Sequence, residues 1–364
     1  MMGLFSWLSA KKAGADSSAE APARPDDAEP ESLDAEMQPG VEVEELSQGL
    51  TAADGGQRVD AARALVERWR MGDLEAADAI APHLHELLDD KEPLVRRAAL
   101  SGVLLMRNPE NLQRCASAVL AHLADPAPQL RIAAISAAAI LPGEIARHQV
   151  RAMLQADDES MRFAAACALS NQHDSAAMPE LIVALRDEHR RQEALTALMS
   201  LGDAAALPEI GALFDEESLE PFDRTMAAAA LARFGDVRGK QYLAERLAEA
   251  TDDRPIAAEW AGRLDVQEAV PALEELSETE NDPARGAALR ALGRLKAPGA
   301  EARLTSMIDD AEAAMDLRMD AAEGLAELGA IGKLESLAGG DGELAQLCRD
   351  LILQVKAEAA QEPK

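Results

Sequence analysis

The stretch RMDAAEGLAELG, residues 318–329, contains one amphipathic helix and its end. Its apolar residues recur every three or four positions, a spacing that places them on one face of an α-helix: Ala321, Ala322, Leu325 and Leu328. Gly329 follows directly, where helices commonly end on a glycine in the left-handed conformation. The stretch therefore predicts a helix that begins near Arg318, buries an alanine-rich face and stops at residue 329.

This pattern occurs eight times along the chain, at spacings of 29 to 35 residues. Each copy begins with an arginine, and we call these residues the ladder arginines: Arg96, Arg131, Arg162, Arg191, Arg224, Arg254, Arg285 and Arg318. Three positions after each ladder arginine stands an alanine, without exception: Ala99, Ala134, Ala165, Ala194, Ala227, Ala257, Ala288 and Ala321. A fixed small residue at a buried position allows neighbouring helices to approach closely, and a larger one would overpack the contact.

A second, shorter helical pattern precedes each arginine-led helix. Several copies have proline in the first turn, where no intrahelical hydrogen bond is lost: Pro82, Pro179, Pro208 and Pro271. Acidic residues such as Asp125 and Asp187 follow this pattern and can cap the next helix. The repeating unit is a helix, an acidic turn and a second helix in about 32 residues, a period typical of stacked solenoids.

These motifs resemble the short HEAT-like repeat of bacterial proteins, the type named after phycobilisome lyases. The resemblance rests on the proline, the leucine-rich first helix, the aspartate turn and the run Arg318–Gly329, and it covers roughly residues 73–335. It implies an all-α fold, an α-α superhelical solenoid. The family includes chromophore lyases as well as many scaffolds and adaptors, so the resemblance leaves the activity open.

Composition narrows the function classes. The net charge of −30 argues against a nucleic-acid partner, and no apolar stretch reaches the ~18 residues that a membrane span needs. Three scattered cysteines fit a reducing compartment, so we expect a cytoplasmic protein. Of the six histidines only His83 and His85 lie close together, and residues two apart do not share a helix face. We therefore expect no metal site and no cofactor.

The sequence divides into four segments. Residues 1–12 form a short amphipathic tag, with Leu4, Phe5, Trp7 and Leu8 followed by two lysines. Residues 13–54 are acidic and proline-containing, typical of a disordered linker. We expect the solenoid over 55–357, with capping helices at its two ends, and a disordered C-terminus over 358–364. The tag can dock into a partner, contact a membrane surface weakly, or be an untidy terminus.

Two sets of residues are candidates for function. Ladder arginines could bind anions, but each follows acidic residues that can pair with it, so we favour a structural role. The large apolar residues Ile132 and Phe163 occupy the position after the arginine in consecutive repeats. Together with Ser136, Ile140 and Cys167 they could form a surface for a partner peptide or helix, or they could pack under a neighbouring turn.

An enzymatic function is not expected. The sequence has no glycine-rich phosphate loop, no GxSxG and no HExxH motif. With nine aromatic residues it has few rings to line a pocket for a chromophore. The sequence favours a non-enzymatic scaffold or adaptor, or an assembly factor, whose protein partner has a basic or amphipathic helical surface. The alternative is a HEAT-like lyase or a small-ligand-binding solenoid.

Overall fold

The computed structural model describes residues 42–361, with side chains up to residue 357, and every regular element in that part is a helix. The chain divides into two compact units, Met1–Ala79 and Ile80–Lys364. In the first unit α2 (Val43–Gly49) packs against α3 (Gly55–Arg70), and α4 (Leu74–Ile80) begins after a tight turn. The predicted all-α solenoid of HEAT-like repeats is confirmed.

The second unit is built from nine helix pairs. The first helices are α5 (Leu84–Leu87), α7 (Pro109–Ala121), α9 (Glu144–Ala152), α11 (Met178–Ala184), α13 (Leu207–Phe214), α15 (Val237–Arg246), α17 (Val270–Glu278), α19 (Ala300–Asp309) and α21 (Ile331–Ala338). The second helices are α6 (Pro93–Leu105), α8 (Pro128–Ala139), α10 (Glu159–Ser170), α12 (Arg191–Leu201), α14 (Pro221–Arg233), α16 (Arg254–Arg263), α18 (Arg285–Arg294), α20 (Met315–Leu328) and α22 (Glu343–Gln361).

Short 3₁₀ segments begin or end several of the first helices. They are η1 (Ala81–His83), η2 (His122–Ala124), η3 (Met153–Gln155), η4 (Ser175–Ala177), η5 (Ala204–Ala206) and η6 (Gln267–Ala269). The predicted prolines lie in the first turn of their helical segments, as at Pro179 in α11 and Pro208 in α13. Gly329, the predicted helix end, has a φ of +81°, and Gly202 ends α12 in the same way with a φ of +73°.

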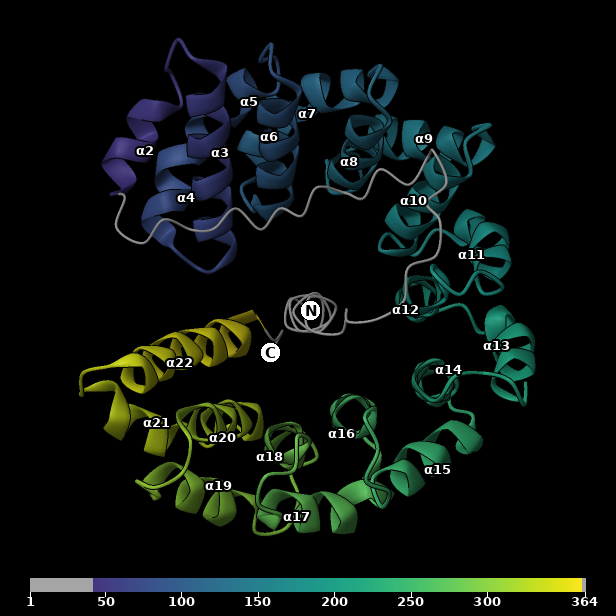
Figure 1. Cartoon of the computed structure of the whole chain (residues 1–364), viewed down its shortest axis with the longest axis vertical. Coiled ribbons are helices and arrows are strands. Elements are labelled where there is room, and N and C mark those ends of the chain that lie inside the picture. The colour runs from purple at the N-terminus through teal and green to yellow at the C-terminus, as the bar shows by residue number, and fades with distance from the viewer. Residues whose placement is uncertain (1–41, 362–364) are drawn as a thin grey trace, which may run out of the picture. The chain divides into compact units, whose positions relative to one another are not determined.

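Within the second unit the helices form two layers along a curved path. From α7 onward the first helices lie on the outer side and the second helices on the inner side (Figure 1). From α6 to α22, each second helix also packs against the next second helix along the chain. Its solvent-facing side is therefore the inner face, because the outer helices and the two neighbouring second helices cover its other sides.

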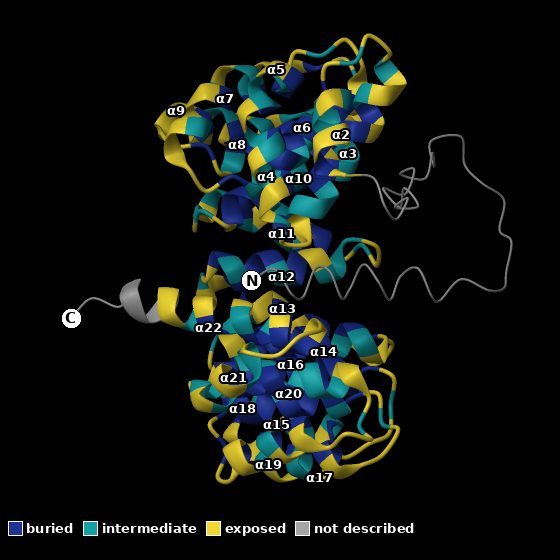
Figure 2. Cartoon of the chain, turned by 90° about the vertical axis from the view of Figure 1, so that its left-hand side faces the viewer, coloured by how far each residue is buried: buried dark blue, intermediate teal, exposed yellow. Residues whose placement is uncertain are grey.

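The core follows the alanine register found in the sequence. The alanine three positions after each ladder arginine has no exposed surface in all eight copies. Buried residues run along the second helices while exposed residues gather on the outer ones (Figure 2). Val or Leu at these alanine positions would push adjacent second helices apart, because a packed interior has no free volume for added methyl groups.

The structure differs from the predicted boundaries at both ends of the array. Helix α2 lies inside the segment predicted as linker, because Val43 and Leu50 are buried at the contact with α3. Helix α22 runs to Gln361, past the predicted end at residue 357. The two helices expected as caps, α3 and α22, are each the second helix of a full pair. Leu4, Phe5, Trp7 and Leu8 lie outside the described residues.

Candidate functional site

The ladder arginines close the turn between the two helices of each pair. Arg96 Nη1 donates to the carbonyl oxygens of Asp90 and Lys91, at 2.9 and 3.1 Å. Arg131 and Arg162 repeat this arrangement, and the other five also donate to carbonyl oxygens at the end of the preceding helix or in its turn. The last carbonyls of a helix have no intrahelical donor and carry the negative end of its dipole. A guanidinium supplies the missing hydrogen-bond donors and a positive charge next to that end.

Acidic partners, which the sequence favoured, occur in four of the eight copies. Arg96 pairs with Asp125 at 3.3 Å, Arg191 with Asp223 at 2.6 Å, and Arg254 with Asp282 at 2.5 Å. Asp125 and Asp282 lie in the next turn along the array, and Asp223 lies in the first turn of α14, each about 30 residues from its arginine. Arg162 pairs with Glu180 at 3.3 Å. The arginines therefore close their own turns and, in these copies, also bind a neighbouring repeat.

Two further arginines take the same role, which the sequence reasoning missed. Arg58 in α3 donates to the carbonyl oxygens of Ala52 and Ala53, at 2.8 and 3.2 Å. Arg349 in α22 donates to those of Ala338 and Gly340, at 2.7 and 3.2 Å. Arg349 stands 31 residues after Arg318, within the repeat spacing, but Ile352 stands where the other copies have alanine three positions after the arginine. The repeat period alone would have been enough to identify Arg349 as a member of the series.

The predicted partner surface is only partly exposed. Phe163 is 7% exposed, and the guanidinium of Arg190 lies 5.5 Å from the centre of its ring. Arg190 is held there by Glu159 at 2.6 Å and by the hydroxyl of Ser160 at 3.2 Å. Of the two alternatives that the sequence left open for Phe163, the structure favours packing against a neighbouring repeat, because the Arg190 side chain of the next repeat covers the ring.

The other four residues of that surface lie on α8 and α10. Ile140 is exposed, whereas Ile132, Ser136 and Cys167 are half-buried. The Ser136 hydroxyl donates to the carbonyl oxygen of Ile132 in its own helix, at 3.4 Å. Burial and the nearby Glu193 raise the pKa of the Cys167 thiol, which keeps it protonated and weakly nucleophilic.

One register position separates the inner face into two parts. Five residues after the ladder arginine, α6 to α14 carry small uncharged side chains, which we call the neutral ridge: Ser101, Ser136, Cys167, Thr196 and Ala229. The same position in α16, α18 and α20 carries Glu259, Arg290 and Glu323. The inner face is thus uncharged at this position in its first five second helices and charged in the next three.

The charged part is a network of partly buried ion pairs. Glu259 accepts from Arg263 at 2.7 Å and from Arg294 at 2.5 Å. Burial raises the pKa of Glu259, but Arg294, Arg263 and Arg290 outweigh burial and hold that pKa below its ordinary value. Arg290 also pairs with Asp320, whose pKa burial nevertheless raises. These arginines are neutralised within the network, so the cluster presents no free cationic site.

The described residues contain neither a cluster of metal ligands nor a cysteine with a lowered thiol pKa. Among residues 42–357, no group of three or more His, Cys, Asp or Glu side chains is placed to hold a metal ion. Burial raises the pKa of Cys115 and Cys348, so both thiols stay protonated. A shallow open depression between α19 and the turn after α20 is lined mainly by small side chains, with the hydroxyls of Thr305 and Ser306.

These features define an α-solenoid whose second helices present an inner face and whose arginines serve the turns. Residues 254–326 match the family model of HEAT repeats, so this part of the chain consists of HEAT repeats. HEAT repeats generally mediate contacts between proteins. No curated protein sequence matches the chain. Within the part that the structure describes, no helix combines the length and the apolarity needed to cross a membrane.

Several solved structures are similar at low identity. The YibA protein of Escherichia coli is 20% identical over 71% of this chain and 93% of that chain, with a TM-score of 0.38. The complex of CpcE and CpcF of phycocyanin lyase from Nostoc sp. is 19% identical over 86% and 99%, with a TM-score of 0.39. Human deoxyhypusine hydroxylase in complex with glycerol is 19% identical over 71% and 99%, with a TM-score of 0.30.

Proposed function

We propose that the chain is a non-enzymatic cytoplasmic adaptor that binds a protein partner on the inner face of its second unit, along the neutral ridge. The observation that carries the proposal is the character of this ridge. Its side chains are small and uncharged on five consecutive second helices. Those of the first four helices, from Ser101 on α6 to Thr196 on α12, are half-buried and accessible, whereas Ala229 on α14 is fully buried. Small side chains let a partner approach the helix backbones closely, and no ridge side chain itself carries a charge that has to be desolvated on binding.

Two hydroxyl groups of the ridge, those of Ser136 and Thr196, are already satisfied by their own helices. Ser136 donates to Ile132 O at 3.4 Å, and Thr196 donates to Gln192 O at 2.9 Å. A partner that covers them therefore leaves no unpaired hydroxyl behind. The amphipathic helix is the partner shape that fits such a surface, with its apolar side on the ridge and basic residues toward the acidic body.

Site-specific photo-crosslinking in cells tests the proposal. A photoreactive residue at Ser136 or Thr196 should capture one defined polypeptide, whereas the same residue at Val183 should not. Val183 is the matched control, because it is 59% exposed on the outer helix α11. Arginine at position 136 should then weaken co-purification of that polypeptide while the variant stays folded. Equal capture from positions 136 and 183 would contradict the proposal.

The same experiment separates related roles. An adaptor or scaffold stays with its partner in the finished complex, whereas an assembly factor is absent from it. A purified chain that carries a coloured or co-eluting small molecule would instead favour a lyase or a ligand-binding solenoid.

A further inference from the structure

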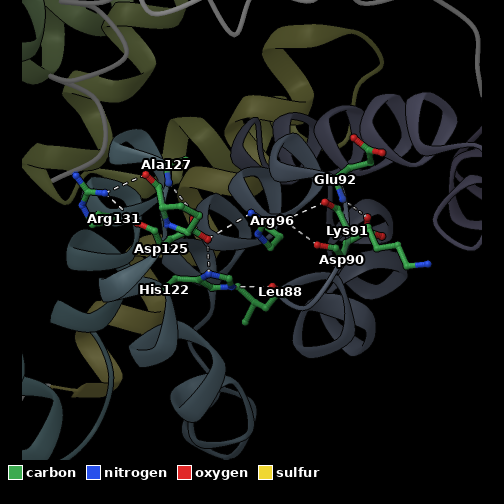
Figure 3. A network of polar contacts seen from close by, with 10 residues as sticks. Leu88, Asp90, Lys91, Glu92, Arg96, His122, Asp125, Ala127 and Arg131 are labelled. Carbon is green, nitrogen blue, oxygen red and sulfur yellow. Dashed lines mark hydrogen bonds and ion pairs between the residues drawn. The ribbon is translucent and has the colours of Figure 1, made fainter.

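His122 lies at the junction between two repeats and has a contact at each ring nitrogen (Figure 3). It follows the last residue of α7 and begins η2. Its Nε2 is 2.7 Å from the carbonyl oxygen of Leu88, in the turn after α5. Its Nδ1 is 3.1 Å from Oδ2 of Asp125, in the turn after α7. The side chain is 12% exposed, so water does not readily replace either contact.

Both of these partners accept hydrogen bonds. A backbone carbonyl oxygen is an acceptor only. Burial raises the pKa of Asp125, but the Ala127 N–H and the groups of His122 and Arg96 together hold that pKa below its ordinary value. The carboxylate is therefore ionised near neutral pH and also only accepts.

A neutral imidazole cannot satisfy this arrangement. It carries one N–H, and the other nitrogen is an acceptor that would face an acceptor oxygen. An imidazolium carries two N–H groups and satisfies both oxygens. Histidine is the side chain that ordinarily changes charge between pH 5 and 8. We propose that His122 is a pH-sensitive clasp that, when protonated, ties the turn after α5 to the turn after α7, and releases one of them when neutral.

Each element packed against His122 also contributes charged groups. Arg96 on α6 donates to the same Oδ2 of Asp125, at 3.3 Å. The remaining charged groups on these elements are Asp89, Asp90, Lys91 and Glu92 after α5, His85 and Glu86 on α5, Arg97 on α6, Glu110 and Arg114 on α7, Arg131 on α8, and Glu144, Arg147, His148 and Arg151 on α9.

Several of these side chains are directed elsewhere by their contacts. Arg131 donates to the carbonyl oxygens of Asp125 and Pro126, and Arg151 pairs with Asp174 on the following repeat. Arg114 lies 3.5 Å from Nδ1 of His85. Release of the clasp leaves the Arg96–Asp125 pair as the polar tie between the two turns. Because repeats in a solenoid are coupled through neighbour interfaces, one weakened junction allows local opening without global unfolding.

Hydrogen exchange and histidine NMR test this inference on the full chain. In ¹⁵N-histidine spectra, His122 should show two N–H groups at pH 5.5 and one at pH 8. Protection of the amides in residues 88–92 and 122–127, corrected for intrinsic exchange, should fall about tenfold over the same range, as expected for one hydrogen bond to a charged group. His122→Gln should remove this pH dependence, whereas His148→Gln, an exposed control on α9, should retain it.

Two results would overturn the inference. One is a single N–H on His122 throughout the range, which the unaltered protein reports even if the variant folds poorly. The other is an unchanged pH response of these amides in His122→Gln.

Discussion

The close approach of α18 and α20 predicts that alanine at Gly293 destabilises the array. A Cβ built at Gly293 would lie 2.1 Å from the carbonyl oxygen of Gly324 and 2.8 Å from its Cα. Real Cβ atoms essentially never come closer than 3.0 Å to another heavy atom, so the two helices must separate by about 0.9 Å. The obstructing atoms belong to the helix backbone, and no side-chain rotation can relieve the clash.

The magnitude follows from two opposing effects. Alanine in a helix interior is favoured over glycine by roughly 1 kcal/mol. Overpacking a well-packed contact costs about 1–3 kcal/mol, and a contact with a rigid backbone belongs at the upper end of that range. We expect Gly293→Ala to lower the free energy of unfolding by about 2 kcal/mol.

Gly332 is the matched control for this substitution. It lies in the first turn of α21, is exposed, and has open space where a Cβ would stand. Gly332→Ala keeps the propensity gain without the clash, so it should raise stability by about 0.5–1 kcal/mol. The same chemical change should therefore have opposite signs at the two positions.

Urea unfolding followed by circular dichroism measures both variants, and hydrogen exchange of α18 and α20 locates the effect. Unfolding midpoints are compared, because repeat arrays do not always unfold in one cooperative step. A Gly293→Ala variant at least as stable as the unaltered protein would refute the close approach of the two helices.

Two further predictions concern the polar contacts between repeats. Arg191→Leu removes the ionic partner of the buried Asp223, whose carboxylate then keeps the hydrogen bond from Gln192, at 3.0 Å. The free energy of unfolding should therefore fall by about 3 kcal/mol. In a double-mutant cycle Arg191→Leu with Asp223→Leu should cost clearly less than the sum of the single changes, and simple additivity would contradict the pairing. Burial raises the pKa of Asp253, but Arg246 and Thr225 outweigh burial, and the pKa lies below its ordinary value of 3.8. That stabilisation is present above pH ~4 and lost as pH falls through the lower folded value, so Asp253→Asn should destabilise at pH 7 and progressively less below pH 3.8, whereas a pH-independent deficit would argue against it.

The sequence predicted the repeat well because its signal is local. An alanine three positions after an arginine defines one helix face within a single turn, and all eight alanines are buried without exposed surface. It missed α2 because Val43 stands among acids and Leu50, the C-cap, follows a glycine, and the burial of both residues is a tertiary property.

The candidate site was predicted less well, because its residues depend on the next repeat. Phe163 has the register of a surface residue, yet Arg190, 27 positions later, covers its ring. The ladder arginines were expected to meet acids, but backbone carbonyls are their common partners, and no sequence pattern marks a carbonyl.

The sequence by itself determined the all-α repeat, its register and the eight helices that carry the ladder arginines, although five of these helices begin three residues before the arginine. Tertiary structure alone decided which repeats are bound by carboxylates, which inner-face residues stay accessible and that His122 spans two turns. The physical reason is distance along the chain. Helix periodicity is determined by residues within about four positions of one another. The contacts between repeats join atoms about 30 residues apart, and their separation depends on how closely alanine and glycine let the helices stack.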